Sequence, residues 1–348
     1  MRSSPRWKTT NATTRATRVQ ATPSTPTIPW FGTTSLRRSA IGWSRCFRFD
    51  LAAVLGRDGN GNLLANPPLL EKIAEDPILR DVKIIAEAWD AAGAYEVGSF
   101  SERRWTECNG QYRDDVTRFW RGDHEGADAN FSRNYGAEGK TTDVEIEDLR
   151  KRQIKNFLLT LLISRVVPML LGGDEFRRTQ GGNNNAYCQD NETSCLDWSC
   201  LEQHREIFRF TLGMIAFRRA HPALSQGQFY TDSEIHWCGL EGGLPNWTNP
   251  KQKQFACLIH EDELSALYLM FNADTDAIDF NLPSAPPEAR WHLAVDTAHE
   301  VPQDLFVAGE EPVWENSQTY HLSPRSSVIL LARGTNVKSL QTTLTEIQ

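Results

Sequence analysis

Every second residue is apolar from Phe47 to Leu51, and this alternation predicts an extended strand over Phe47–Leu55. Arg48 and Asp50 fall on the side opposite the apolar residues. A cation two residues before an acid favours the ionised form of that acid. Taken alone, the pattern fits an ordinary strand with a surface ion pair. The alternative is a strand that ends in a held, ionised carboxylate.

The next two segments predict a helix and a second strand. Pro67–Ile78 has a proline near its start and an apolar stripe at helical spacing, which predicts a helix. Val82–Glu87 is a mainly apolar run that ends in an acid. Strand, helix and strand in this order predict a parallel pair. Asp50 and Glu87 then follow neighbouring strands, at the edge where parallel barrels place their chemistry.

Further along the chain, helical spacing is strongest over Asp143–Arg165, where Asp143 is expected to cap the helix. We expect a short strand or turn near Tyr112, a buried strand over Val166–Leu171, and a last helix over His204–Ala220.

From about Ser225 onward the pattern changes to short strands separated by Pro and Gly clusters, which predicts an all-β sandwich domain. The expected strands are Phe255–His260, Ser265–Asn272, Trp291–Val295 and Ser327–Ala332. The predicted organisation is therefore a leader over 1–46, a catalytic α/β domain over 47–223 and a β-sandwich over 224–348.

Composition narrows the functional classes. The chain has 348 residues, of which 40% are hydrophobic, and a net charge of −8. Nine of its 37 basic residues and none of its 45 acidic residues precede Asp50, so the body is acidic and no nucleic-acid partner is expected. No stretch is apolar enough to span a bilayer, so no membrane partner is expected.

Two further expectations concern the cysteines and the leader. The seven cysteines show no metal-binding spacing, so we expect reduced thiols, no metal and no cofactor, in an intracellular protein of the cytoplasm or a plastid. Residues 1–46 are rich in Thr, Ser, Arg and Pro, which predicts disorder. They fit either a transit peptide or a leader that is not native sequence.

Several motifs resemble the isoamylase and glycogen-debranching branch of the alpha-amylase superfamily. The resemblance runs from Phe47 to about Arg333, and its longest and most specific motif is Asn183–Glu192. The others are Phe47–Ala52, Ala86–Asp90, Arg113–Val116, Leu171–Phe176, Trp237–Gly239 and Tyr320–Ser326.

This resemblance implies an α/β fold, a partial (β/α)8 TIM barrel followed by the C-terminal sandwich. It also implies a retaining glycoside hydrolase that cleaves α-1,6 branch linkages of glycogen or amylopectin. By motif, Asp50 would be the nucleophile and Glu87 the general acid/base, and Glu87 should have a raised pKa. Arg48 would keep Asp50 ionised.

The resemblance also places Trp89, Asp174 and Tyr187 beside the α-glucan substrate. Asp174 fits a role in shaping its loop equally well. Trp105 and Trp120 are expected in the core, and Arg113–Asp115 in a structural ion-pair network. The sequence leaves the oligomeric state and the branch-length preference open.

The chain departs from the family pattern in two places. The family's early barrel segment has no counterpart before Phe47, and a gap is indicated near 123–130. The family's His-Asp motif, which supplies a third carboxylate, is missing, since no His-Asp pair occurs in the chain. We therefore expect little or no activity from this chain. The alternative function is a non-catalytic, glucan-binding regulatory subunit.

Overall fold

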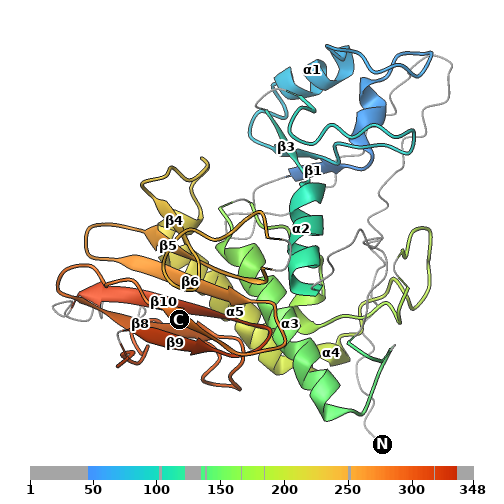
Figure 1. Ribbon diagram of the computed structural model, residues 1–348. Coiled ribbons are helices and arrows are strands. Elements are labelled where there is room, and N and C mark those ends of the chain that lie inside the picture. The colour runs from blue at the N-terminus through green and yellow to red at the C-terminus, as the bar shows by residue number, and fades with distance from the viewer. Residues whose placement is uncertain are drawn as a thin grey trace, which may run out of the picture. The chain divides into compact units, whose positions relative to one another are not determined.

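The computed structural model describes residues 46–101, 104–121, 135–137, 139–165, 167–183, 185–249, 252–316 and 318–334 (Figure 1). The chain divides into two compact units, Met1–Tyr112 and Arg113–Gln348. The predicted leader, apart from Cys46, and the predicted gap near 123–130 lie outside the described residues.

The first unit is built on a three-stranded parallel sheet. Its strands are β1 (Cys46–Phe49), β2 (Lys83–Ala86) and β3 (Trp105–Glu107), in that order across the sheet. Helix α1 (Pro68–Glu75) connects β1 to β2. The predicted strand–helix–strand unit with a parallel pair is thus confirmed.

The core of the first unit lies between α1 and this sheet. Leu70 of α1 packs with Ile84 and Trp105, and all three are buried. The indole N–H of Trp105 donates to the carbonyl of Leu70 at 3.3 Å. The prediction that Trp105 belongs to the core is confirmed, and its polar atom is satisfied there.

The first predicted strand is shorter than expected. It ends at Phe49, and the chain enters the 3-10 helix η1 (Ala52–Gly56) after Leu51, whose backbone is left-handed at φ 46°. The alternation therefore stops two residues early, and the prediction for Leu51 was wrong. The reason is packing, because Ala52 and Ala53 turn inward and are fully buried in the core.

Two more predictions in this region need correction. The helix expected over Pro67–Ile78 ends at Glu75, and Ile78 is exposed. Asp76 precedes a proline, which disfavours helical backbone. The segment near Tyr112 is neither strand nor turn but part of helix α2 (Gly110–Arg121). The side chain of Asn109 accepts the N–H of Tyr112 at 2.9 Å, which is a helix-starting contact.

The second unit contains two antiparallel sheets, and its sheet-rich C-terminal region was predicted. The larger sheet has the order β4-β5-β6-β10-β8, and β7 pairs with β9. The four predicted strands are confirmed, whereas β4, β7 and β9, each of four residues, were missed. The strands are β4 (Ile235–Cys238), β5 (Gln254–His260), β6 (Ala266–Asn272), β7 (Ile278–Asn281), β8 (Ala289–Asp296), β9 (Thr319–Leu322) and β10 (Ser326–Gly334).

The helices of the second unit follow the predicted pattern. Helix α3 (Val144–Ile163) begins after Asp143, whose carboxylate accepts the N–H groups of Glu145 and Ile146 at 3.0 and 3.3 Å, so the predicted cap is confirmed. Helix α5 (Arg205–Ala220) is also confirmed. The shorter elements are η2 (Asp174–Phe176), α4 (Ser199–Gln203) and η3 (Pro222–Leu224).

Both faces of the larger sheet are covered. Leu267, Leu269 and Phe271 of β6 pack with residues of α3 and α5, which lie along one face of the sheet (Figure 1). Tyr268 and Met270 of the same strand pack with residues of β7 and β9 on the other face. This explains why β6 is an uninterrupted apolar run, since alternate residues enter two different cores.

The segment Val166–Leu171 is not a strand in its described part, so that prediction was wrong. Val167, Met169 and Leu171 are 65%, 53% and 57% exposed. An apolar run becomes a strand only where a neighbour supplies backbone partners, and among the described residues none pairs with this segment.

Two further observations concern the cysteines and the apolar helices. All seven cysteines are free, as predicted. In the part of the chain that is described, no helix is both long enough and apolar enough to cross a membrane.

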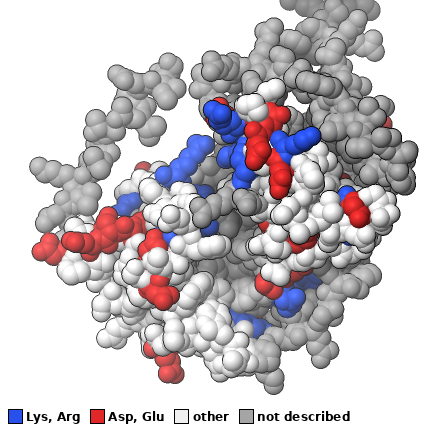
Figure 2. Space-filling model, turned by 90° about the horizontal axis from the view of Figure 1, so that it is seen from above, with Lys and Arg blue, Asp and Glu red and all other residues white. Residues whose placement is uncertain are grey.

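Charged side chains are spread over the surface. On the face in Figure 2, Asp and Glu side chains lie in several separate groups, and Lys and Arg side chains stand beside some of them. The acidic excess of the sequence therefore does not form one continuous acidic area on that face.

A buried ion cluster ties the helices of the second unit to its larger sheet. Asp304, which is 0% exposed, contacts Lys155 of α3 and Arg209 of α5, with 2.7 Å between Lys155 Nζ and Asp304 Oδ2. Asp304 itself follows β8 and donates its backbone N–H to Glu300. Two cations from two helices therefore depend on one carboxylate.

Asp304→Asn should lower the free energy of unfolding of the second unit by about 3–5 kcal/mol, because it leaves buried cations uncompensated. Urea unfolding followed by circular dichroism measures the change. Asp232→Asn, at an exposed aspartate of the same unit, should stay within about 0.5 kcal/mol of the parent. Equal losses in the two variants would contradict the role of the cluster.

Candidate active site

Glu87 is fixed by its backbone between two parts of the neighbouring chain. The N–H of Glu87 donates to the carbonyl of Phe49, and the N–H of Ala52 donates to the carbonyl of Glu87, both at 2.9 Å. These two bonds continue the parallel ladder between β1 and β2 beyond its last paired residues. Asp50 and Leu51, which lie between Phe49 and Ala52, are thereby held beside Glu87.

The carboxylate of Glu87 is bound from two sides. The N–H of Leu51 donates to Oε2 at 3.1 Å, and Nη2 of Arg48 donates to Oε1. The left-handed backbone of Leu51 costs about 1–2 kcal/mol for an L-residue. Such strain is tolerated where surrounding contacts fix it, and it often marks functional sites.

Asp50 is the exposed member of the pair. Its side chain is 64% exposed, whereas that of Glu87 is 13% exposed. Arg48 Nη1 lies 3.9 Å from Asp50 Oδ1. From the sequence, Arg48 was expected to keep Asp50 ionised, but its closer partner is Glu87. The alternation of side chains could not reveal this, because Glu87 comes from the other strand.

The pKa of Glu87 is raised, first by burial and then by its hydrogen bond with Asp50. The N–H of Leu51 and the charge of Arg48 oppose the increase in this pKa. Burial outweighs them, so the predicted direction is confirmed. A carboxyl whose pKa is raised, beside a second, exposed carboxyl, is the arrangement that acid-assisted displacement requires.

Trp89 forms an aromatic surface two residues beyond Glu87. Its ring stacks with that of Tyr95, with 6.2 Å between centroids and 14° between planes. Gly110 lies against the pair, since a Cβ there would be 3.0 Å from the hydroxyl of Tyr95. Tyr95 was missed in the sequence. The only signal for it is an aromatic residue six positions after Trp89, across a turn containing Gly93.

The turn between Trp89 and Tyr95 is fixed by a buried ion pair. Asp90 accepts the N–H groups of Ala92 and Ala94, and Arg57 Nε lies 2.6 Å from Asp90 Oδ2. The hydrogen bond from Arg57 holds the pKa of Asp90 below its usual range. Asp90 therefore orients the aromatic pair through the backbone.

Asp174 and Tyr187 lie in the second unit, whereas the other four candidate residues lie in the first. Asp174 begins η2, and burial raises the pKa of its carboxyl, an effect that the charge of Arg178 opposes. Tyr187 is about half exposed, and its N–H donates to the side chain of Asn185 at 3.0 Å.

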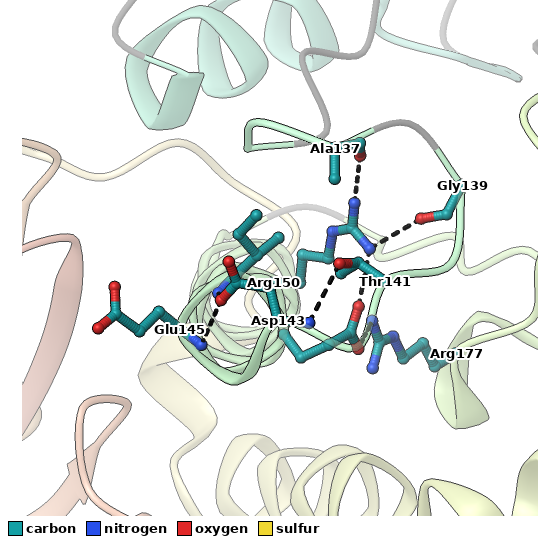
Figure 3. Close-up of polar contacts among 9 residues, drawn as sticks. Ala137, Gly139, Thr141, Asp143, Glu145, Arg150 and Arg177 are labelled. Carbon is teal, nitrogen blue, oxygen red and sulfur yellow. Dashed lines mark hydrogen bonds and ion pairs between the residues drawn. The ribbon is translucent and has the colours of Figure 1, made fainter.

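An ion-pair network anchors the residues that follow Asp174. Glu147 of α3 bonds Arg150 and Arg177, each at 2.7 Å. The guanidinium of Arg150 points at the carbonyls of Ala137 and Gly139 (Figure 3). Arg177 directly follows η2, so these bonds attach η2 to the N-terminal part of α3.

The structure also bears on Trp120, which was expected in the core, and on Arg113, which was expected in an ion pair. Trp120 is fully buried, as predicted, and its indole N–H donates to the hydroxyl of Thr160 at 3.1 Å. Arg113 pairs with Asp114 at 2.7 Å on the surface. Among the described residues, no group of three or more His, Cys, Asp or Glu side chains is arranged to hold a metal ion.

The chain resembles a known family and several known proteins in sequence. Residues 236–330 match the family described as "Isoamylase 1-3, C-terminal". The chain is 34% identical to isoamylase 3, chloroplastic, of Oryza sativa subsp. japonica over 82% of this chain and 44% of that protein. It is 32% identical to the glycogen debranching enzyme of Pectobacterium carotovorum, over 71% of this chain and 45% of that protein.

Solved structures of pullulanases show the same fold. The pullulanase type I from Bacillus subtilis, complexed with maltose, superimposes with a TM-score of 0.59 at 18% identity over 84% of this chain and 44% of that one. A pullulanase from Paenibacillus barengoltzii, complexed with maltohexaose and alpha-cyclodextrin, superimposes with a TM-score of 0.55 at 19% identity. The match covers 83% of this chain and 48% of that one.

The chain thus resembles isoamylases and glycogen debranching enzymes in sequence and pullulanases in fold. The resemblance to the isoamylase and glycogen-debranching branch of the alpha-amylase superfamily is confirmed. The chain spans less than half the length of each of the two curated relatives described above.

The opposing effects on Glu87 predict opposite responses of its pKa. In Asp50→Asn the pKa of Glu87 should fall, because the acceptor and charge that favour its protonated form are weakened. In Arg48→Gln it should rise further, because the opposing cation is removed. Carbon-detected NMR titration of glutamate carboxyls measures both changes.

Glu96 is the internal control for this titration. Burial raises its pKa too, but its charged neighbours are Asp90, Arg57 and Glu107, so both substitutions should leave it unchanged. Because the folded pKa of Glu87 lies above the unfolded value, its contribution to stability is present at low pH. That contribution is lost as pH rises through the folded pKa. If the pKa of Glu87 moved in the same direction in Asp50→Asn and in Arg48→Gln, the opposing effects assigned to Asp50 and Arg48 would be contradicted.

Proposed function

We propose that this chain carries the catalytic pair of a retaining glycoside hydrolase that cleaves α-1,6 branch linkages of glycogen- or amylopectin-type glucans. The observation that supports this most is the pair itself. Exposed Asp50 and largely buried Glu87, whose pKa is raised, meet at the ends of adjacent parallel strands. The isoamylases and debranching enzymes among its relatives support the substrate class.

In the proposed mechanism, Asp50 attacks the anomeric carbon of the branch sugar while Glu87 gives its proton to the departing glycosidic oxygen. A covalent glycosyl–Asp50 ester forms. Glu87, now ionised, takes a proton from a water molecule that cleaves the ester, and the anomeric configuration is retained. The mechanism requires carboxyl groups about 5–5.5 Å apart, so the hydrogen bond between Glu87 and Asp50 must open when a sugar enters the site.

The remaining candidate residues are assigned to substrate contacts. Trp89, stacked on Tyr95, offers an apolar ring face to a sugar. Arg48 steadies Glu87 after its proton has left, when the carboxylate is ionised. Asp174 and Tyr187, in the second unit, are assigned to substrate binding by their place in the family's motifs. No metal or cofactor enters the proposed reaction.

The proposed architecture keeps the domains expected from the sequence. Residues 47–223 form part of a (β/α)8 barrel, residues 224–348 a β-sandwich, and residues 1–46 a separate leader. An intracellular location, in cytoplasm or plastid, is supported by relatives that include chloroplastic isoamylases. Because the His-Asp motif of the family is missing, the proposed activity of the chain alone is low.

The first test is hydrolysis of amylopectin. The purified chain should release reducing ends far more slowly than rice isoamylase 3 at equal concentration, because loss of one cooperating carboxylate costs orders of magnitude in rate. Asp50→Asn should remove the remaining release. Release that persists in Asp50→Asn would overturn the assignment of the nucleophile. Binding of amylopectin without any release would favour the regulatory alternative.

The second test separates the two catalytic roles. With α-maltotriosyl fluoride, fluoride leaves without needing a proton, so Glu87→Gln should keep most of the parent's first-turnover rate. Asp50→Asn should lower the first-turnover rate by at least about a thousandfold. A fluoride electrode in stopped-flow mode measures the burst.

Matched variants complete this second test. Glu96→Gln and Asp58→Asn, at carboxyls of the first unit outside the pair, should behave like the parent. Equal losses for Glu87→Gln and Asp50→Asn on the fluoride would refute the proposed division of labour.

A further inference from the structure

The second unit contains an open cleft of about 880 Å³ between the edge strand β8 and the β7–β9 pair. Its polar and aromatic lining includes Asn281, Ser284, Arg290, Trp314, Glu315 and Gln318. The volume falls in the range of pockets that take a ligand of drug-like size, about 300–1,000 Å³. None of the residues proposed for catalysis lines it.

The aromatic wall of the cleft is held in place. The indole N–H of Trp314 donates to the carbonyl of Thr319 at 3.2 Å, and its ring lies 4.4 Å from that of Tyr320. The backbone N–H of Trp314 donates to the carbonyl of Trp291 at 2.8 Å. Its orientation is therefore set before any ligand arrives, which lowers the entropic cost of binding.

The opposite wall is tied down in the same way. The backbone N–H of Leu282 donates to the carbonyl of Gln318 at 2.8 Å, so the loop before β9 is fixed against the end of β7. Asn281, whose N–H donates to Leu240 at 2.9 Å, ends β7 at the same place. Both walls therefore have fixed backbones.

The polar side chains of the cleft are free to bind. Within the part of the chain that is described, the side chains of Asn281, Ser284 and Gln318 make no hydrogen bond to protein. Each amide presents a donor and an acceptor, and the hydroxyl presents both in one group. This set complements vicinal hydroxyl groups, which are themselves donors and acceptors.

The charges of the cleft lining cancel in sum. Arg290 and Glu315 are the only ionisable side chains among its lining residues, and they have opposite signs. Neither makes an ion pair with another described residue. The lining is neutral in sum, so it does not favour a phosphate, a nucleotide or a cation.

We propose that this cleft is a second glucan-binding site, which holds a short linear α-1,4-linked glucose oligomer away from the catalytic pair. Trp314 supplies the apolar face for a pyranose ring, and Asn281 and Gln318 bind its hydroxyl groups. The choice of an α-glucan rests on the proposed function. The neutral, polyhydroxylated character of the ligand rests on the cleft alone.

The test is calorimetric titration of the full-length chain with maltohexaose, in the Asp50→Asn background so that no sugar is hydrolysed. Gln318→Ala and Asn281→Ala should each weaken binding about three- to tenfold, the effect of one lost hydrogen bond. Trp314→Ala should weaken it more than tenfold. The dissociation constant should stay constant between about 0.05 and about 0.5 M NaCl, since the ligand is neutral.

Controls separate the cleft from other surfaces. Gln228→Ala, at an exposed glutamine without a hydrogen-bonding partner in the described structure, should bind normally. Trp247→Ala removes an exposed tryptophan that does not line the cleft, so this variant should also bind normally. Thermal unfolding checks that the Trp314→Ala protein is folded, and the two amide variants test the cleft independently of it.

The outcomes distinguish this inference from the proposed function. If the cleft variants bind as well as their parent, the cleft proposal is overturned even where hydrolysis is found. If cellohexaose binds as tightly as maltohexaose, the choice of an α-glucan as the ligand is overturned. If the chain hydrolyses nothing but its cleft variants lose maltohexaose, the cleft stands and the catalytic proposal fails. Loss of binding in Trp89→Ala alone would place the ligand in the first unit and overturn the cleft.

Discussion

The candidate site depends on the two backbone hydrogen bonds that hold Glu87 between Phe49 and Ala52. They extend a parallel ladder past the ends of β1 and β2, so two carboxyls from separate strands come together at one edge of the sheet. The turn at Leu51 then directs an N–H at the Glu87 carboxylate. The strand pairing also places the side chain of Glu87 where it is largely buried. That burial raises the pKa of Glu87 and so favours its protonated form.

In the second unit, the larger sheet is covered on both faces. Alternate side chains of β6 and β10 enter a helical core on one face and a second sheet on the other. Buried polar contacts fix the position of the helices on this sheet. Asn156 of α3 bonds Thr297 at 2.7 Å and Ser327 at 3.0 Å, and Asp304 joins α3 to α5. Such contacts are costly to leave unpaired, so they allow one docking geometry and exclude others.

The partners of the catalytic residues were harder to predict than the residues themselves. Asp50, Glu87 and Trp89 stand in motifs, so they could be named from the sequence. The contact of Arg48 with Glu87, the stacking of Tyr95 on Trp89 and the anchoring of Asp90 by Arg57 all join segments that are distant or separated by a turn. Local periodicity contains no information about such contacts. The cleft beside β8 was likewise invisible, because β7 and β9 are short strands without a strong pattern.

The sequence by itself determined the parallel strand–helix–strand unit, the two long helices of the second unit, its main strands and the motifs of the debranching family. These follow from local spacing, capping and residue identity, which act over a few positions. The tertiary structure decided where strands end and which charges meet. It turned Leu51 out of the strand, and among the described residues it left Val167–Leu171 without a strand partner despite an apolar composition. The reason is physical, because a strand exists only where a second segment accepts its backbone hydrogen bonds, and that segment lies elsewhere in the chain.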